Sequence, residues 1–177
     1  MGTIIGIIAF LMLGSAAVAG MSAAPWLPTL PSQRKHLLDH LKLDQSQSVI
    51  DLGCGDGSLL FAIARRYPNL QCIGYEISLF PLAIAWLRKL WSFRAYRHVH
   101  IRFGNLFKQN ISQADVIFIF LLNRCYHKLV PILQSQLKPS ARVVVEAWPL
   151  PELHPSQVLK AESLLPVYVY PGTAFRD

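Results

Sequence analysis

From residue 49 onward, short runs rich in β-branched and aromatic residues alternate with longer stretches of helical character. This alternation is typical of a parallel sheet whose strands are connected by helices. The run 116–122 is apolar throughout, which indicates a central strand covered on both faces. We therefore predict an α/β fold with a Rossmann-like, doubly wound sheet. The predicted strands are 49–51, 71–75, 99–103, 116–121 and 142–147, the predicted helices are 58–67, 79–91 and 126–137, and a closing hairpin is expected at 158–161 and 164–170.

The N-terminal segment has a different composition, because residues 3–24 contain no charge and the first Lys or Arg is Arg34. About 20 apolar residues are enough for a helix to cross a bilayer. Basic residues follow the run and none precedes it, which favours a retained anchor over a cleaved signal peptide or a buried core helix. The same charge order predicts a single-pass protein whose main domain lies on the cytosolic or matrix side.

The 177 residues suffice for one domain beyond this anchor. We predict a transmembrane anchor at 1–24, a proline-rich linker at 25–31 and a catalytic or binding domain at 32–177. Trp26, just past the apolar run, is expected to lie at the membrane surface. Ser32 is expected to cap an amphipathic docking helix that carries Leu37 and Leu41.

A glycine-rich turn follows the first predicted strand, in the sequence Asp51-Leu-Gly53-Cys54-Gly55-Asp-Gly57. In open α/β sheets, ligands bind at the carboxyl ends of the strands. Glycine permits a close approach of backbone to ligand, and the helix that follows offers free N–H groups. The turn is therefore the predicted ligand site.

Glu76 ends the second predicted strand, where an acid can accept hydrogen bonds from the hydroxyls of a ribose. Both NAD and S-adenosylmethionine (SAM) contain such a ribose. The GxGxxG spacing of dinucleotide folds is absent, because the turn reads Gly53-x-Gly55-x-Gly57 after an acidic residue. This pattern favours SAM and leaves NAD as the weaker alternative.

With these motifs, the chain resembles the class I, seven-strand SAM methyltransferases, and more closely the small membrane-anchored protein-lysine methyltransferases. Mitochondrial members of that family modify the c-ring protein of ATP synthase and the adenine nucleotide translocase. The segments that carry the resemblance are 25–29, 50–57, 74–77, 105–107, 137–144 and 170–176.

The resemblance implies a SAM-binding site and a lysine as methyl acceptor. It implies that Asp51 and the glycines surround the methionine part of SAM, that Glu76 binds the ribose, and that Asn105 and Leu106 lie at the adenine edge. Asn105 departs from the family's usual Asp, and the segment 122–126 differs from the vertebrate members. The implied cofactor-binding residues are Asp51, Gly53, Cys54, Gly55, Gly57, Glu76, Ile77, Asn105 and Leu106.

Methyl transfer needs a neutral nucleophile aligned with the methyl carbon, so proximity and orientation can supply most of the catalysis. No catalytic residue is required by the sequence. Asn123 and Tyr126 are candidates for orienting an acceptor amine, although a strand-end turn and a helix are the simpler explanation of both. Glu146, at the end of the fifth predicted strand, fits either the rim of the cleft or a solvated position. The rival functions are methylation of a lipid or small molecule and adenosine binding without turnover.

Metal and nucleic-acid sites are not predicted. The three cysteines lack the spacing of metal ligands, and His36 and His40 have no obvious third ligand. The net charge of +7 is partly concentrated between Arg88 and Arg102. No nucleic-acid motif accompanies that cluster, so anionic lipid or solvent is its expected environment and nucleic acid is not an expected partner.

Overall fold

The sheet has seven strands in the order β3-β2-β1-β4-β5-β7-β6. The first five strands along the chain pair in parallel, and β7 lies antiparallel to both β5 and β6. The structure, a computed structural model, describes residues 2–44 and 46–176. Its strands are β1 Ser48–Leu52, β2 Gln71–Glu76, β3 Val99–Phe103, β4 Val116–Ile119, β5 Arg142–Glu146, β6 Gln157–Leu159 and β7 Val167–Pro171.

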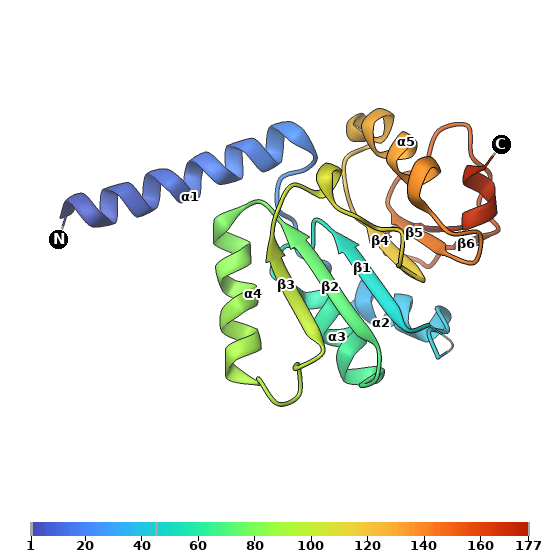
Figure 1. Cartoon of the computed structure of the whole chain (residues 1–177), viewed down its shortest axis with the longest axis horizontal. Helices are drawn as coiled ribbons and strands as arrows, with labels where there is room; N and C mark the ends of the chain where they lie inside the picture. Colours follow the sequence, from blue (N-terminus) through green and yellow to red (C-terminus); the bar gives the residue numbers. More distant parts are fainter. Residues whose placement is uncertain (1, 45, 177) are drawn as a thin grey trace.

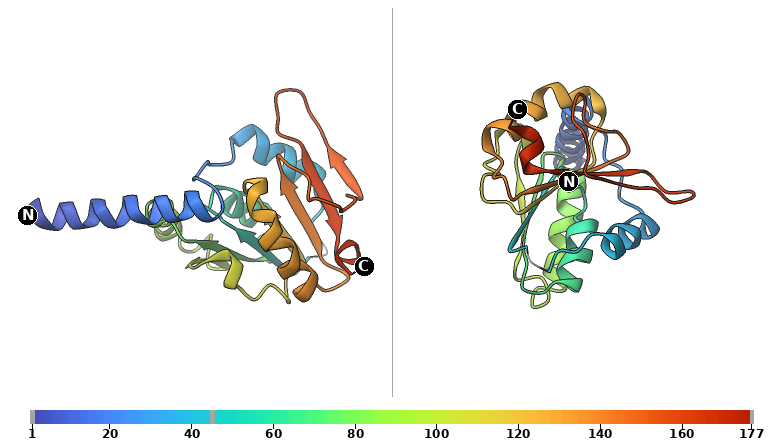
Figure 2. Two further views of the ribbon diagram at one scale, coloured as in Figure 1. Left: turned by 90° about the horizontal axis from the view of Figure 1, so that it is seen from above. Right: turned by 90° about the vertical axis from the view of Figure 1, so that its right-hand side faces the viewer.

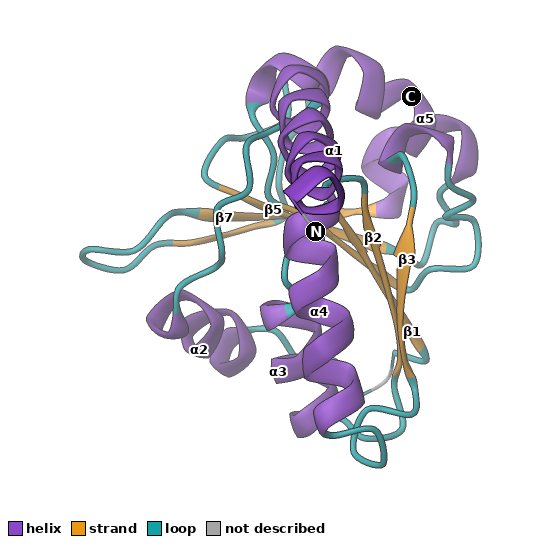
Figure 3. Cartoon of the chain, turned by 90° about the vertical axis from the view of Figure 1, so that its left-hand side faces the viewer, coloured by secondary structure: helices purple, strands orange, loops and turns teal. Residues whose placement is uncertain are grey.

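Helices cover both faces of the sheet, with α2, α3 and α4 on one side and α5 on the other (Figures 1 and 3). Buried residues such as Leu60 and Leu82 form the core of the first side, while Leu129 and Tyr170 belong to that of the second. The helices are α1 Gly2–Ser22, α2 Pro31–His40, α3 Ser58–Arg66, α4 Leu79–Trp91 and α5 Tyr126–Gln136, with 3₁₀ turns η1 Leu106–Lys108, η2 Asn123–Cys125 and η3 Gly172–Phe175.

This architecture confirms the predicted α/β class, the central position of β4 and the closing hairpin of β6 and β7. The predicted bounds of α4 are those observed. The prediction that Ser32 caps α2 is wrong. The helix begins at Pro31 and its N-cap is Leu30, two residues before Ser32, and no side chain caps it. Proline is suited to the first position of a helix because its missing N–H needs no partner there.

The strand β4 ends at Ile119, two residues before its predicted end. Phe120 and Leu121 leave the sheet and line a cavity at the carboxyl edge instead. An apolar run alone cannot show where a strand gives way to a loop, because a buried loop side chain is as apolar as a buried strand side chain.

The helix α1 extends away from the domain (Figures 1 and 2). Side chains along its free part, such as Ile4, Phe10 and Leu13, are exposed, whereas Ala19 is buried near its carboxyl end. Within the described part of the chain, Thr3–Met21 is the one stretch long and apolar enough to cross a bilayer. The backbone N–H of Leu79, at the start of α4, donates a hydrogen bond of 3.0 Å to the hydroxyl of Ser15. This contact joins α1 to the domain.

Candidate active site

A cavity lies at the carboxyl ends of the parallel strands, where the sequence predicts a ligand site. Its empty volume is about 1100 Å³, which includes space open to solvent at the mouth. The glycine-rich turn after β1, the end of β2 and the loop after β3 form one half of the wall. The loop after β4, the end of β5 and the segment between α1 and α2 form the other half.

The glycine-rich turn adopts backbone angles that favour glycine, with φ values of 89° at Gly53, 54° at Gly55 and 72° at Gly57. The carbonyl of Tyr75 in β2 accepts hydrogen bonds from the N–H groups of Gly53 (2.9 Å) and Cys54 (3.0 Å). The turn is therefore fixed against the neighbouring strand. Gly53 and Gly55 line the cavity, whereas Gly57 lies outside the lining and caps α3.

Glu76 connects the turn to the start of α4. Its buried carboxylate accepts hydrogen bonds from the N–H groups of Gly55 (2.9 Å), Ile77 (2.9 Å) and Ser78 (2.7 Å). Burial raises the pKa of Glu76, and these three hydrogen bonds oppose the rise. A carboxylate has about four acceptor sites, so capacity remains for a ligand hydroxyl. The predicted ribose contact stays a prediction, and the structure adds that Glu76 shapes the turn.

Three carboxylates converge on the cavity from different strands: Asp51 of β1, Glu76 of β2 and Glu146 of β5. The register places Asp51 beside Gly74 and Phe118, and Phe118 beside Val144. Because side chains alternate along a strand, the three acids lie on the same face of the sheet. Burial raises the pKa of Asp51 well above its usual range, and the negative charges of Glu146 and Glu76 raise it further.

The charged side chains that line the cavity in the described part of the chain are all acidic. Asp56 also lines it, but this carboxylate pairs with Arg88 at 2.7 Å. Among the residues that the structure describes, no Lys, Arg or His lines the cavity. Like charges gathered in a buried site are unfavourable unless a ligand brings the opposite sign. The cavity is therefore suited to a positively charged ligand.

Glu146 is the residue whose role the sequence left open, and it lies buried in the cavity wall with a relative exposure of 2%. One carboxylate oxygen, Oε2, has no hydrogen-bond partner among the described residues. Burial raises the pKa of Glu146 to about 7, although a hydrogen bond from Gln33 lowers it in part. A buried polar atom without a protein partner can bind an ordered water, an ion or a ligand, which makes this oxygen a candidate contact in the cavity. Its sequence signal is an acid that ends an otherwise apolar strand.

The proline-rich segment 25–31 forms part of the site. Residues Pro25 to Thr29 line the cavity. The indole of Trp26 lies over the turn, so that a Cβ added at Gly55 would come within 2.7 Å of it. Its ring also meets Phe80 of α4 edge-on, with centroids 5.7 Å apart. Trp26, predicted at the membrane surface, lines the cavity and is about one-third exposed.

The remaining predicted cofactor residues also reach the cavity. Cys54, Ile77, Asn105 and Leu106 all line it. The side-chain oxygen of Asn105 accepts a hydrogen bond from the N–H of Phe107 at 2.9 Å, which caps η1. Burial raises the pKa of Cys54 well above its usual range, so its thiol stays protonated. The contact of Asn105 with adenine remains a prediction.

The two candidate catalytic residues, Asn123 and Tyr126, lie outside the cavity lining. Asn123 is exposed at the start of η2. The buried hydroxyl of Tyr126 lies within hydrogen-bond distance of the carbonyls of Leu121 (3.4 Å) and Trp148 (3.2 Å), which share its one hydrogen. Tyr126 thus joins two segments that do line the cavity, and its position is that of a structural residue.

Comparison with known proteins agrees with this geometry. The family model described as the ANTKMT methyltransferase domain matches residues 51–157. A protein-lysine N-methyltransferase of Saccharolobus islandicus is 32% identical over 145 residues, covering 80% of this chain and 89% of that protein. The Xenopus laevis lysine N-methyltransferase of the ATP synthase c-ring protein is 31% identical, covering 86% of this chain and 65% of that protein. The chain thus spans just under two thirds of this vertebrate relative.

Among solved structures, an RNA methyltransferase of Salinibacter ruber in complex with S-adenosylhomocysteine superimposes with a TM-score of 0.75 and 29% identity. The match covers 82% of this chain and 93% of that one. SAM carries a sulfonium and an ammonium group, so it meets the requirement of the acidic cavity for positive charge. The chain belongs to the ANTKMT methyltransferase domain family and is a SAM-dependent methyltransferase.

Proposed function

We propose that this enzyme methylates a lysine of a protein held in or beside a membrane. The observation that carries the proposal is the unpartnered carboxylate oxygen of Glu146, buried in the cavity wall at the end of β5. A lysine brings an ammonium group to such a carboxylate and an alkyl chain to the apolar wall beside it. That wall includes Leu121, Leu122 and Trp148. The relatives named as lysine methyltransferases support the same acceptor.

Glu146 has the properties of a proton acceptor for this reaction. The amine must lose its proton before it can attack, and a general base works best with a pKa near the operating pH. Burial brings the pKa of Glu146 to about 7. When bound, SAM supplies the methyl group, and its sulfur keeps the bonding electron pair. The apolar wall favours the neutral amine by desolvation, and Glu146 takes the released proton on its unpartnered oxygen.

The end of the cavity formed by β1 and β2 has the features expected of a cofactor site. Asp51 lines the part of the cavity proposed for the cationic methionine end of SAM, and Glu76 lines the part proposed for its ribose. Hydrogen bonds to Tyr75 and Glu76 fix the shape of the turn before a cofactor binds. Preorganisation of this kind lowers the cost of aligning donor and acceptor.

The position of α1 supports an acceptor at the membrane. Ala19 and Ala23, at the end of α1 and just beyond it, line the cavity together with the segment that follows. A helix that crosses a bilayer would therefore hold the cavity close to the bilayer surface. The order of charges supports a domain on the cytosolic or matrix side. We propose a single-pass attachment with this orientation.

The test is to incubate the full chain in vesicles with SAM carrying a labelled methyl group and, separately, with membrane proteins, lipid extract and RNA. The proposal expects label in the protein fraction, located on lysine by peptide mass spectrometry. Label in lipid alone would assign the activity to a lipid methyltransferase, and label in RNA alone would match the Salinibacter ruber relative. Either result contradicts the lysine proposal, as does SAM binding without transfer to any fraction.

A further inference from the structure

The helix α4 is apolar on the side that faces away from the domain. Pro81, Leu82 and Ala85 form its buried side. On the opposite side the exposed residues are apolar as well, with relative exposures of 73% for Leu90 and 93% for Trp91. A surface helix ordinarily presents polar residues to water, and a helix that is apolar all round needs a second apolar environment. The described part of the domain leaves these outer residues uncovered.

The outer side forms one continuous stripe. Phe80, Leu87, Leu90 and Trp91 follow the spacing of one helical face, and all are exposed. Phe93, just past the helix, extends the stripe and is also exposed. Contiguous exposed apolar surface of this kind marks an interaction site.

The surroundings of the stripe are basic. Between Glu76 and Asp115 the sequence contains no acidic residue and six Lys or Arg residues. Arg94 and Arg97 are exposed just beyond α4, and Arg88 and Lys89 lie near its end. Arg88 pairs with Asp56 but leaves 45% of its side chain exposed. Positive charge beside an apolar stripe complements an anionic lipid surface better than it complements a neutral protein groove.

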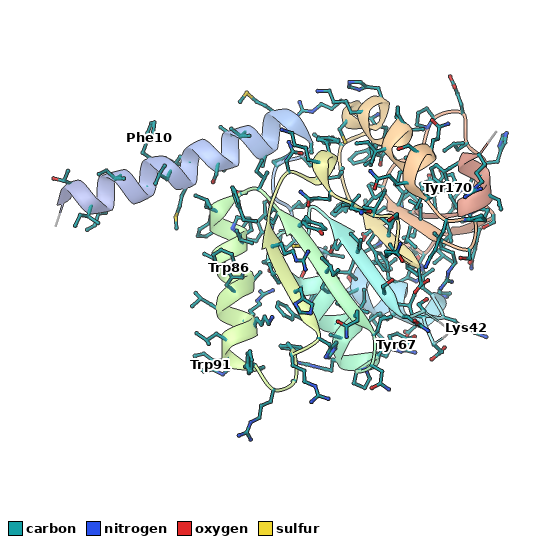
Figure 4. The ribbon with its side chains drawn as sticks, viewed as in Figure 1. Phe10, Lys42, Tyr67, Trp86, Trp91 and Tyr170 are labelled. Carbon is teal, nitrogen blue, oxygen red and sulfur yellow. The ribbon has the colours of Figure 1, made fainter. Side chains whose placement is uncertain are left out.

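The orientation of α4 relative to α1 identifies the partner. α4 runs across the direction of α1, on the side of the domain from which α1 projects (Figures 1 and 3). Trp91 lies at the far end of α4 and is exposed, whereas Trp86 donates its indole N–H to the carbonyl of Ile101 in β3 at 3.1 Å (Figure 4). If α1 crosses a bilayer, α4 therefore lies along the bilayer surface with its apolar stripe toward the lipid.

The depth of α4 agrees with this arrangement. Leu79, at the start of α4, bonds to Ser15, seven residues before the end of α1 at Ser22. At 1.5 Å per residue, the start of α4 lies roughly 10 Å from the end of α1 along its axis. An interfacial helix is buried about 5–10 Å into the boundary between headgroups and acyl chains. The apolar part of α1 and the stripe of α4 can thus enter the same bilayer together.

We propose that α4 and the turn after it, residues 79–97, form an interfacial membrane-binding element for bilayers that contain anionic lipid. The inference rests on the proposed membrane attachment and adds a second contact to it. With α1 as the only contact, the domain would rotate freely about the helix axis. The contact of α4 holds the domain in one orientation, with the cavity at a constant height above the bilayer.

The test is quenching of tryptophan fluorescence by lipids with brominated acyl chains, using the full chain in vesicles of phosphatidylcholine and phosphatidylglycerol. Trp91 is expected to be the most strongly quenched tryptophan. Trp91→Phe should remove the largest share of the quenching, whereas the matched control Trp148→Phe should leave it nearly unchanged. Replacing phosphatidylglycerol by phosphatidylcholine should decrease the quenching, because the basic residues lose their anionic partners.

A second pair of variants excludes misfolding as an explanation. Leu87→Glu and Leu90→Glu change exposed residues, so folding should persist, and calorimetric binding of SAM checks it. Both should abolish the quenching of Trp91, whereas Val158→Glu, an exposed change in β6, should not. If the full chain binds to vesicles but Trp91 is not quenched, the proposed role of α4 is wrong and the attachment through α1 is unaffected. A full chain that does not sediment with vesicles would overturn the membrane attachment itself, and α4 with it.

Discussion

The two halves of the cavity differ in how they are built. The half formed by β1 and β2 consists of a local turn with three glycines at positive φ and an acid that accepts three backbone hydrogen bonds. The half formed by β4 and β5 contains an apolar wall and one buried acid, Glu146, with a free oxygen. Hydrogen bonds within the protein fix the first half, whereas the second presents an acid oxygen without a partner among the described residues. These differences support the proposal that the first half binds the cofactor and the second binds the acceptor.

The largest effect is expected from Glu76→Ala, which tests the half formed by β1 and β2. The change leaves the N–H groups of Gly55, Ile77 and Ser78 without their acceptor. At about 1–3 kcal/mol for each of the three unsatisfied donors, the free energy of unfolding should fall by roughly 3–9 kcal/mol. Urea denaturation measures the loss. Glu76→Gln keeps one acceptor oxygen and should lose less, and equal stability of all three proteins would show that Glu76 does not hold the turn.

The pH dependence of stability tests the half formed by β4 and β5. The pKa of Glu146 is raised to about 7 in the folded chain, so its protonated form favours folding. That contribution is fully present below the unfolded pKa of Glu and is lost as pH rises through about 7. At 1.36 kcal/mol per pKa unit, the loss amounts to about 3 kcal/mol. Asp51 and Glu76 titrate in the same direction, so the comparison must be with Glu146→Gln.

Denaturation of both proteins between about pH 4 and about pH 8, a range that includes the unfolded and the folded pKa of Glu146, gives the difference. The stability of the wild-type chain should fall relative to Glu146→Gln as pH rises. Parallel curves would place Glu146 in contact with water.

Glu146→Gln should also separate the two functions of the cavity. Loss of a general base typically slows a reaction by about 10²–10⁴-fold. The rate of methyl transfer should fall at least to this extent, while the affinity for SAM, measured by calorimetry, stays within a few-fold. The variant Asp51→Asn should give the reverse pattern, with weakened SAM binding. If Glu146→Gln weakens SAM binding as much as Asp51→Asn does, the division of the cavity into two halves is wrong.

The smallest effect is expected from Tyr126→Phe. The single hydrogen of its hydroxyl is shared between two distant acceptors, the carbonyls of Leu121 and Trp148. Loss of this shared hydrogen bond should lower the free energy of unfolding by about 1 kcal/mol. The rate of methyl transfer should change little, because Tyr126 lies outside the cavity lining. A large decrease in rate in a stably folded variant would return Tyr126 to the catalytic candidates.

The same contrast explains what the sequence could predict. The turn at Gly53 and Gly55 and the acid Glu76 are recognisable because a local backbone geometry demands these residue types at that spacing. The α/β class follows from alternation along the chain. Glu146 is visible in the sequence only as an acid at the end of an apolar run, which does not distinguish a buried acid from a solvated one. Gln33, which donates to it, and residues 25–29, which line the same cavity, lie more than a hundred residues away.

Trp26 and α4 show the same limit. The sequence predicts a linker around Trp26, and the place of this residue over Gly55 depends on how α1 meets the domain. The bounds of α4 are predictable, but its apolar outer side becomes visible only when the buried side is known. Periodicity identifies a helix and does not show which of two apolar sides faces outward.

The most direct test of the account is single-turnover methyl transfer at saturating SAM, with the full chain and a membrane-protein fraction in the same vesicles, followed by mass spectrometry of lysine-containing peptides. The account predicts methyl-lysine with the wild-type chain and a rate lowered about 10²-fold or more with Glu146→Gln. Methylation of lysine at equal rates by both proteins would contradict the role of Glu146. Transfer to lipid or RNA with none to lysine would contradict the proposed function.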